Sequence, residues 1–157
     1  MNIVADKILE LLREQLSDSR NIERFYLGNP TELSAADLPA IFVQPVRKSV
    51  EQLDNVNDVV TGEFIIGVCV DPAKYQRVDM NEGTAERFLM EIEGGRNSDG
   101  TPITNSVMYV MRNKFTLEGK VAYQEQETIW GEREMTGGVA KEIHIYISLK
   151  FKVKNTT

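Results

Sequence analysis

The stretch VAKEIHIYISLKFKVK (Val139–Lys154) has the most regular pattern in the chain and indicates its fold class. Every second residue in it is large and apolar: Ile143, Ile145, Ile147, Leu149, Phe151 and Val153. The residues between them are polar: His144, Tyr146, Ser148, Lys150, Lys152 and Lys154. Successive side chains of a strand point to opposite faces of its sheet. The pattern therefore predicts a long strand with one face buried under helices and the other exposed.

Three other stretches have a strand pattern. Pro39–Lys48 is the first, and because Pro45 cannot donate a hydrogen bond to a neighbouring strand, we expect it to lie at a sheet edge or to bend there. Asp58–Val70 places five apolar side chains on one face, and Lys120–Trp130 alternates less regularly. We expect Glu51–Asn57 to form a hairpin turn or an extended arm and Glu132–Gly138 to form a loop.

Helical spacing occurs in three places. Asn2–Leu16 carries an apolar stripe with charged residues on its other side, which predicts an amphipathic helix. A second helix is predicted over about Asn81–Glu93, ended by Gly94-Gly95. Ser106 can cap a short third helix. The stretch Ser17–Leu38 is polar and contains a Gly-Asn-Pro turn signal, so it is predicted as a loop that can include a short turn of helix.

The order helix, two strands, helix, two strands predicts an α+β fold. We expect a single domain over residues 1–157, with a mostly antiparallel four-stranded sheet and two to three helices packed on one face. The expected sheet core comprises Phe64, Ile66, Val68, Ile145, Ile147 and Leu149. The expected helix side of that core comprises Val4, Ile8, Leu11, Phe88 and Ile92.

Composition excludes several classes of protein. With 41% hydrophobic residues, the chain has enough apolar surface to fold, which excludes disorder throughout. A net charge of −6 suits neither DNA nor an anionic membrane as a partner unless the basic residues cluster. Cys69 is the only cysteine, so no internal disulfide can form. The sequence has neither a signal-peptide pattern nor an apolar run of roughly 20 residues, and we expect the protein in the cytoplasm.

The residues give little indication of catalysis. One cysteine and one histidine, far apart in the chain, do not make the usual ligand cluster of a zinc site. His144 could act as a base only from the polar face of a regular strand, where cross-strand packing explains it. The carboxylates Glu125, Glu127, Glu132 and Glu134 are interpreted as solvated surface, and Cys69 as a packed, inert thiol. We therefore expect no catalytic, cofactor or metal site.

Three polar segments suggest contacts with other chains: the arm Glu51–Asn57, the loop Arg96–Pro102 and the segment Gln124–Gly138. The last carries the only tryptophan and a methionine among charges, a mixture that recurs in protein interfaces. The alternative interpretation is ordinary loops with one packed tryptophan. The interface candidates are Arg96, Asp99, Tyr123, Glu125, Trp130, Glu132 and Met135.

The layout resembles the tail terminator and tail-completion (head–tail joining) proteins of tailed bacteriophages. The resemblance covers most of the chain: the amphipathic helix Ile3–Leu16, LPAIFVQP (Leu38–Pro45), DVVTGEFIIGVCV (Asp58–Val70), a helix, and the closing strand pair. These motifs are features of a fold and not a fingerprint. The chain differs from the shorter members in its loop Gly94–Pro102 and its long segment Gln124–Gly138.

The resemblance implies a non-enzymatic virion protein, assembled in the host cytoplasm, that forms a hexameric ring. Such a ring caps the tail tube and offers the surface to which the head, through a neck or head-completion protein, attaches. Six copies at −6 each give −36, which is compatible with genomic DNA passing through without specific binding. Two alternatives remain. One is a neighbouring neck or head-completion protein. The other is a small cytoplasmic binding protein or enzyme with a pocket around His144 and Tyr146.

Overall fold

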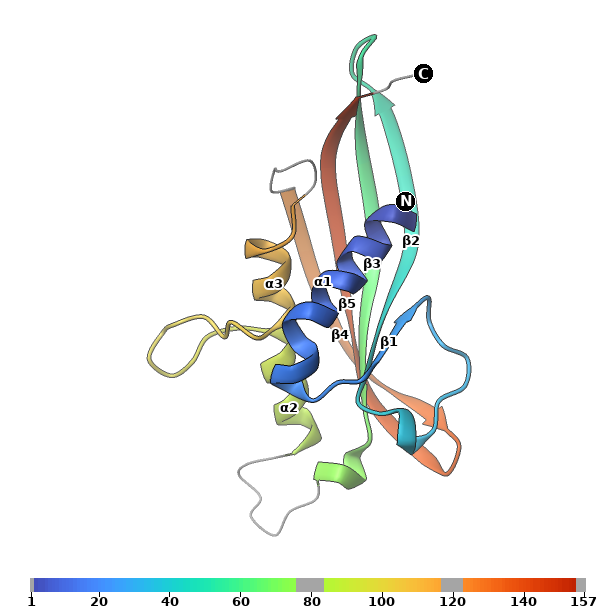
Figure 1. The fold of residues 1–157 in the computed structure, drawn as a ribbon, viewed down its shortest axis with the longest axis vertical. Helices are drawn as coiled ribbons and strands as arrows, with labels where there is room; N and C mark the ends of the chain where they lie inside the picture. Colours follow the sequence, from blue (N-terminus) through green and yellow to red (C-terminus); the bar gives the residue numbers. More distant parts are fainter. Residues whose placement is uncertain (1, 76–83, 117–122, 155–157) are drawn as a thin grey trace.

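The computed structural model describes residues 2–75, 84–116 and 123–154. Within them the chain forms one five-stranded sheet in the order β1-β2-β3-β5-β4, with three helices (Figure 1). The strands are β1 (Arg24–Leu27), β2 (Ala40–Gln52), β3 (Asn57–Val70), β4 (Tyr123–Met135) and β5 (Gly138–Lys154). The helices are α1 (Asn2–Arg20), α2 (Ala85–Glu93) and α3 (Val107–Asn113), with 3₁₀ turns η1 (Ala35–Asp37) and η2 (Pro72–Tyr75).

The α+β class and the mostly antiparallel sheet are confirmed, but the sheet has five strands where four were predicted. The missed strand is β1, which pairs parallel to the start of β2 through Arg24↔Ala40 to Leu27↔Val43. It is four residues long and lies in a stretch predicted as a loop. Its side chains are half-buried or exposed, with Phe25 packed against the core. Such a short strand is held by its neighbour and has little periodicity of its own.

Single residues mark the ends of α2 and the start of α3. Thr84 caps α2, with its hydroxyl accepting a hydrogen bond from the backbone N–H of Arg87 at 3.2 Å. Gly94, at φ 135°, follows the last turn of α2. The hydroxyl of Ser106 accepts from the N–H of Tyr109 at 3.3 Å and caps α3 as expected. Helix α1 runs four residues beyond its predicted end, and the predicted start of the second helix, 81–83, lies outside the described residues.

All three helices cover the same face of the sheet, called here the helix face (Figure 1). The predicted core residues are buried there, and only Leu11 and Phe88 remain partly exposed at its border, so the predicted assignment of faces is confirmed. The buried sheet residues of this face are Ile41, Val43, Phe64, Ile66, Val68, Val70, Ile143, Ile145, Ile147 and Leu149.

The opposite face, called here the second face, is covered only in part. The segment 28–39 lies over it and packs Leu33 and Leu38 against Phe42, Cys69 and Ala140. Lys74 holds this segment by donating to the carbonyl oxygens of Ala35 and Leu38 at 2.8 and 2.6 Å. Farther along the sheet the second face is open, and Val46, Ile129 and Tyr146 are exposed on it.

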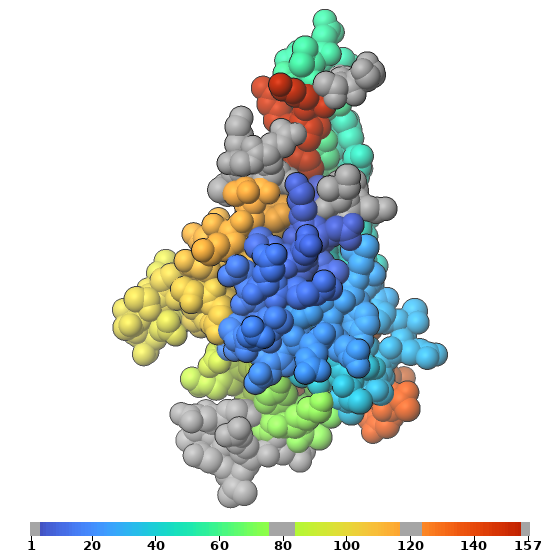
Figure 2. All heavy atoms as spheres, in the orientation of Figure 1, coloured from blue at the N-terminus to red at the C-terminus, as the bar shows by residue number. Residues whose placement is uncertain are grey.

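Toward one end the sheet narrows to a projection, called here the arm, made of residues 46–63 and 148–154 (Figures 1 and 2). Val60 and Leu149 at its base are buried, and only its outer part extends beyond the helices. The expected arm at Glu51–Asn57 is confirmed as a hairpin, since β2 runs to Gln52 and β3 begins at Asn57. At the base of the arm the register shifts between Pro45 and Arg47, which confirms the bend expected at the proline.

The segment Glu132–Gly138 is not the predicted loop. Strand β4 continues to Met135, and only two residues, Thr136 and Gly137, join it to β5. Strand β5 is paired on both sides from Lys141 to Lys150, so it is not the edge strand of the sheet over that stretch. That edge belongs to β4. The predicted start of this strand, 120–122, lies outside the described residues.

Candidate functional site

The outer edge of β4 is the longest strand edge left without a partner in the described part of the chain. Trp130 is paired with Ile143, so its side chain lies on the helix face, at the rim of the core, and 46% of it is exposed. Ile129 points to the second face and is more than half exposed. Apolar side chains therefore flank this edge on both faces, a combination that an isolated subunit would leave in water.

Four glutamates accompany these two apolar residues. Glu125 and Glu127 lie on the second face, and Glu132 and Glu134 on the helix face. Arg133 is the only basic residue of β4, and its guanidinium is directed inward to Glu142. The outer edge of β4, called here the acidic edge, thus combines exposed apolar side chains with excess negative charge.

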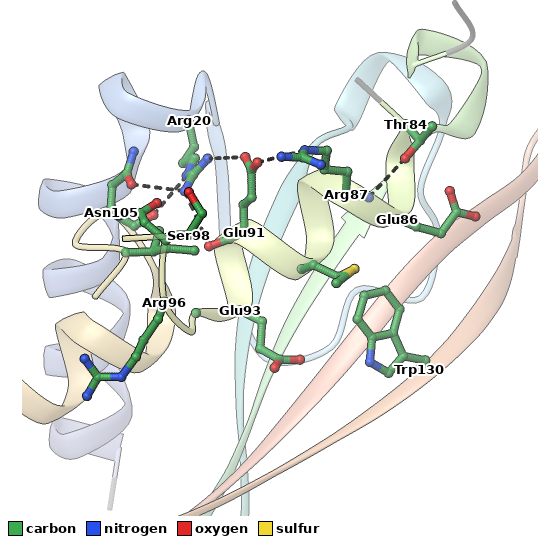
Figure 3. A pocket seen from close by; sticks show the side chains of 14 residues that line it. Arg20, Thr84, Glu86, Arg87, Glu91, Glu93, Arg96, Ser98, Asn105 and Trp130 are labelled. Atoms are coloured by element: carbon green, nitrogen blue, oxygen red, sulfur yellow. Dashed lines mark hydrogen bonds and ion pairs between the residues drawn. The ribbon is translucent and has the colours of Figure 1, made fainter. Parts of the chain in front are cut away.

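Beside Trp130 lies a shallow groove between α2 and the loop 94–105 (Figure 3). Met90, 60% exposed, lines it together with Trp130. At its other end Arg20 donates to the carbonyl and side-chain oxygens of Asn105 at 2.9 and 3.0 Å and reaches Glu91 at 3.4 Å. These contacts join the end of α1 to α2 and to the loop, so this end of the groove is built as a structural crosslink.

A second crosslink ties α2 to the sheet. Lys141 of β5 forms an ion pair with Glu86 of α2. The carboxylate of Glu86 raises the pKa of Lys141, and Glu132, on the same face, raises it further. Glu132 therefore has a positive neighbour within its own chain.

The loop Arg96–Pro102 is folded on itself. Arg96 donates to the carbonyl oxygen of Gly100 at 2.7 Å, and Asp99 accepts from the hydroxyl and N–H of Thr101 at 2.6 and 3.0 Å. The Thr101 hydroxyl is the main reason why the pKa of Asp99 is lowered. The loop is exposed, and Figure 1 shows it projecting from the helix side of the molecule.

A polar cluster is buried on the second face around Glu142. Arg133 Nε and the thiol of Cys69 each lie 3.0 Å from Glu142 Oε2, and His144 Nε2 lies 3.2 Å from Oε1. Arg133 also donates to the carbonyl oxygen of Pro30 at 2.6 Å and to the side-chain oxygen of Asn29. Its guanidinium lies over the ring of Phe42. The cluster therefore fastens the covering segment 28–39 to the sheet.

The surroundings of this cluster keep the carboxyl group of Glu142 ionised and the thiol of Cys69 protonated. Burial by itself raises the pKa of Glu142, but His144, Cys69 and Arg133 outweigh it and bring the pKa to about 2. Burial raises the pKa of the Cys69 thiol, and the hydrogen bond to Glu142 raises it further. Because a nucleophilic cysteine must be a thiolate, this cluster favours the inert thiol predicted from the sequence.

The predicted interface residues fall into three groups. Glu125, Trp130 and Glu132 lie on β4; Tyr123 begins that strand, but its side chain lies outside the described part. Arg96 and Asp99 lie in the loop beyond the groove. Of these two residues, only Arg96 lines the groove. Met135 packs under the segment 28–39.

Three residues of these sites were missed. Met90 was hidden in the helical pattern of α2, and Arg133 and Glu142 were hidden in charged stretches. For Arg133 and Glu142, the only indication was that Glu142 occupies the strand position that pairs with Cys69.

The chain matches no protein-family model, and no curated protein matches its sequence. Within residues 2–75, 84–116 and 123–154, no group of three or more His, Cys, Asp or Glu side chains is arranged to hold a metal ion. In the same part of the chain no helix has the length and apolar character needed to cross a membrane.

Proposed function

We propose that this chain is a non-enzymatic structural subunit of a phage tail, the tail terminator, which forms a hexameric ring on the end of the tail tube and presents the head-attachment surface. The proposal starts from the resemblance in layout. It is compatible with the α+β fold, in which a mostly antiparallel sheet is covered by helices on one face.

The observation that carries the proposal is the presence of two unlike exposed surfaces. One is the acidic edge with Trp130 and Ile129, and the other is the arm, on which Val50, Leu53 and Val56 are more than half exposed. Along β5, the partner of Trp130 is Ile143 while the arm ends at Lys154, so the two surfaces are roughly 35 Å apart. Rings close through contacts between unlike surfaces.

The oligomeric state tests this proposal. We expect sedimentation velocity and native mass spectrometry of the full chain to show hexamers, at high concentration or after addition of tail-tube protein from the same genome. Electron microscopy should then show rings at tube ends. A chain that stays monomeric and also leaves tail tubes unbound would contradict the proposal.

The neighbouring neck or head-completion protein is the alternative within the same class. It would also form a ring but would bind to the head-side components and not to bare tube ends. Incubation with purified tubes and, separately, with the head-side components distinguishes the two.

The alternative of a small binding protein or enzyme finds less support. His144 lies between the carboxylate of Glu142 and the ring of Phe42, with a ring-centroid distance to Phe42 of 5.6 Å. It lines neither of the shallow depressions that flank β4, although Tyr146 lines the one on the second face. A measurable activity that is lost in His144→Ala, with the fold intact, would favour this alternative.

A further inference from the structure

We propose that the acidic edge of one copy binds the arm of the next copy, so that the subunits associate head to tail. This inference rests on the proposed ring and names the two surfaces that make it. The occupant of the acidic edge is thus a second copy of this chain, bound through charge complementarity around an apolar centre.

The arm has the right shape for such a contact. About seven residues of each of its strands form the arm, roughly 23 Å of sheet, with Val60 and Leu149 buried at its base. No helix covers the tip, and Figure 2 shows it as a narrow extension of the surface. At the tip Leu53 and Val56 flank the turn, and Val50 lies on the strand beside them, each more than half exposed. Three apolar side chains in water at the end of a projection indicate a surface that is covered in an assembly.

One strand of the arm, the end of β5, is opposite in charge to the acidic edge, whereas the arm as a whole, residues 46–63 and 148–154, has five basic and four acidic residues. The end of β5, SLKFKVK, carries Lys150, Lys152 and Lys154 on one face with no acidic residue among them, and all three are exposed. Arg47 and Lys48 add positive charge on β2, two strands away, while Glu51 and Glu63 lie on the same face as the lysines. Asp54, the acid of the turn, is engaged by the N–H groups of Val56 and Asn57 at 2.8 and 2.7 Å.

The acidic edge offers the matching surface. Glu127 and Glu134 are exposed on its two faces, and the only arginine of β4 is bound to Glu142. Trp130 and Met90, on the helix face beside the groove, supply the apolar centre. Aromatic and methionine side chains ringed by charged ones are typical of interface centres.

The direction of association follows from the positions of the two surfaces. Trp130 and the tip of the arm are roughly 35 Å apart along β5, and the basic end of β5 differs in charge from the acidic edge, so neither surface pairs well with its own copy. A contact of arm with edge leaves one free arm and one free edge at the ends of each open oligomer. Such a chain of contacts closes only as a ring or continues as a filament.

Covalent trapping tests the contact directly. Leu53→Cys and Met90→Cys are placed in the full-length protein, in which Cys69 is buried. After mild copper-catalysed air oxidation, we expect the double variant to give a ladder of disulfide-linked oligomers on a non-reducing gel. Neither single variant should crosslink, because arm never meets arm. A matched control pair, Leu53→Cys with the exposed Glu23→Cys on the far side of α1, should stay monomeric on the gel.

Charge reversal provides a second, independent test. We expect Lys150→Glu/Lys152→Glu and Glu127→Lys/Glu134→Lys each to weaken self-association at least tenfold. Both pairs of substitutions in one chain should restore it, because the charges are then exchanged. A mixture of the two defective variants should also associate, with the two variants alternating, because each intact edge meets an intact arm and each reversed arm meets a reversed edge. The control Lys7→Glu/Lys114→Glu, on exposed helix positions, should not change association.

The outcomes separate the two proposals. If the wild type forms rings while the double cysteine variant does not crosslink and the charge reversals have no effect, the arm-to-edge contact is wrong and the ring stands. Dimers from a single cysteine variant would also overturn it, because they require like surfaces to meet. If the wild type never associates, with or without tail tubes, both proposals fail.

Discussion

The ring of Phe42 lies directly across Gly67 on the neighbouring strand, where an added Cβ would be 2.0 Å from Cε1 of Phe42. Gly67 in turn pairs with His144, whose ring meets Phe42 edge-on at 5.6 Å, and the guanidinium of Arg133 lies over the same ring at 5.4 Å. The absence of a side chain at position 67 thus allows the ring of Phe42 on β2 to contact three other strands on the second face.

Gly67→Ala should therefore destabilise the protein. The methyl group would displace the Phe42 ring and disturb its contacts, at a cost of about 1–3 kcal/mol in the free energy of unfolding. Chemical denaturation measures this cost. Gly131→Ala is the matched control, because it lies in a strand and has no heavy atom within 4 Å of the added Cβ. Equal losses in the two variants would show that the close approach at Gly67 has no energetic importance.

Leu149→Ala should cost about 2–5 kcal/mol, because Leu149 is fully buried in the core on the helix face and its truncation leaves a cavity. Thermal and chemical unfolding measure the loss. Val139→Ala, on the same strand but nearly half exposed, should change stability by less than about 1 kcal/mol. A loss below about 1 kcal/mol for Leu149→Ala would contradict the burial of this face.

The carboxylate of Glu142 should make stability depend on acid pH. Its pKa is about 2 in the folded protein, below its ordinary value of 4.5, so its contribution is present above about pH 4.5 and is lost as the pH falls toward 2. Glu142→Gln should be less stable than the wild type by about 3–5 kcal/mol at pH 7, since it leaves Arg133 without its partner. The difference in the free energy of unfolding between the wild type and Glu142→Gln should narrow as the pH falls from 4.5 to 2. Glu134→Gln, at an exposed position, should give a gap that is constant with pH.

Cys69 should not react with thiol reagents while the protein is folded. It is fully buried, and burial together with Glu142 raises its pKa, so the reactive thiolate is scarce at pH 8. Labelling with iodoacetamide followed by mass spectrometry should show modification only after addition of denaturant. The variant Leu53→Cys, exposed at the tip of the arm, should be modified once in the native state and twice in the unfolded state. Rapid native labelling of Cys69 would reopen a role for the thiol in chemistry.

Trp130→Ala should leave the monomer folded but weaken assembly on tail tubes by about tenfold or more, as expected of an aromatic residue at an interface. The side chain is 46% exposed, so its removal costs little core packing. Circular dichroism checks the fold, and tube-binding assays check assembly. Leu27→Ala, half exposed on β1 at the opposite edge of the sheet, is the control. An unfolded Trp130 variant would place the residue in the core, and normal assembly would make it incidental to the interface.

The sequence by itself determined the elements that have a regular period over many residues. The alternation in Gly138–Lys154 defined β5 and the face that carries Leu149, and the stripe of Asn2–Leu16 defined α1, because burial on one side imposes a period that can be read directly. The caps at Ser106 and Gly94 were also local, since each depends on one residue and its own turn. The burial of Cys69 followed from its position among apolar strand residues, whereas its contact with Glu142 did not.

The tertiary structure alone decided which polar residues are buried and which edge is free. Arg133 and Glu142 look like surface charges in the sequence, yet they meet because the turn after Met135 folds β4 back on β5 and the segment 28–39 closes over them. The strand β1 exists because β2 offers its edge, not because of any period in Arg24–Leu27. The order of strands placed β4 and not β5 at the edge, since that order depends on pairing between residues distant in the chain, which no local pattern records.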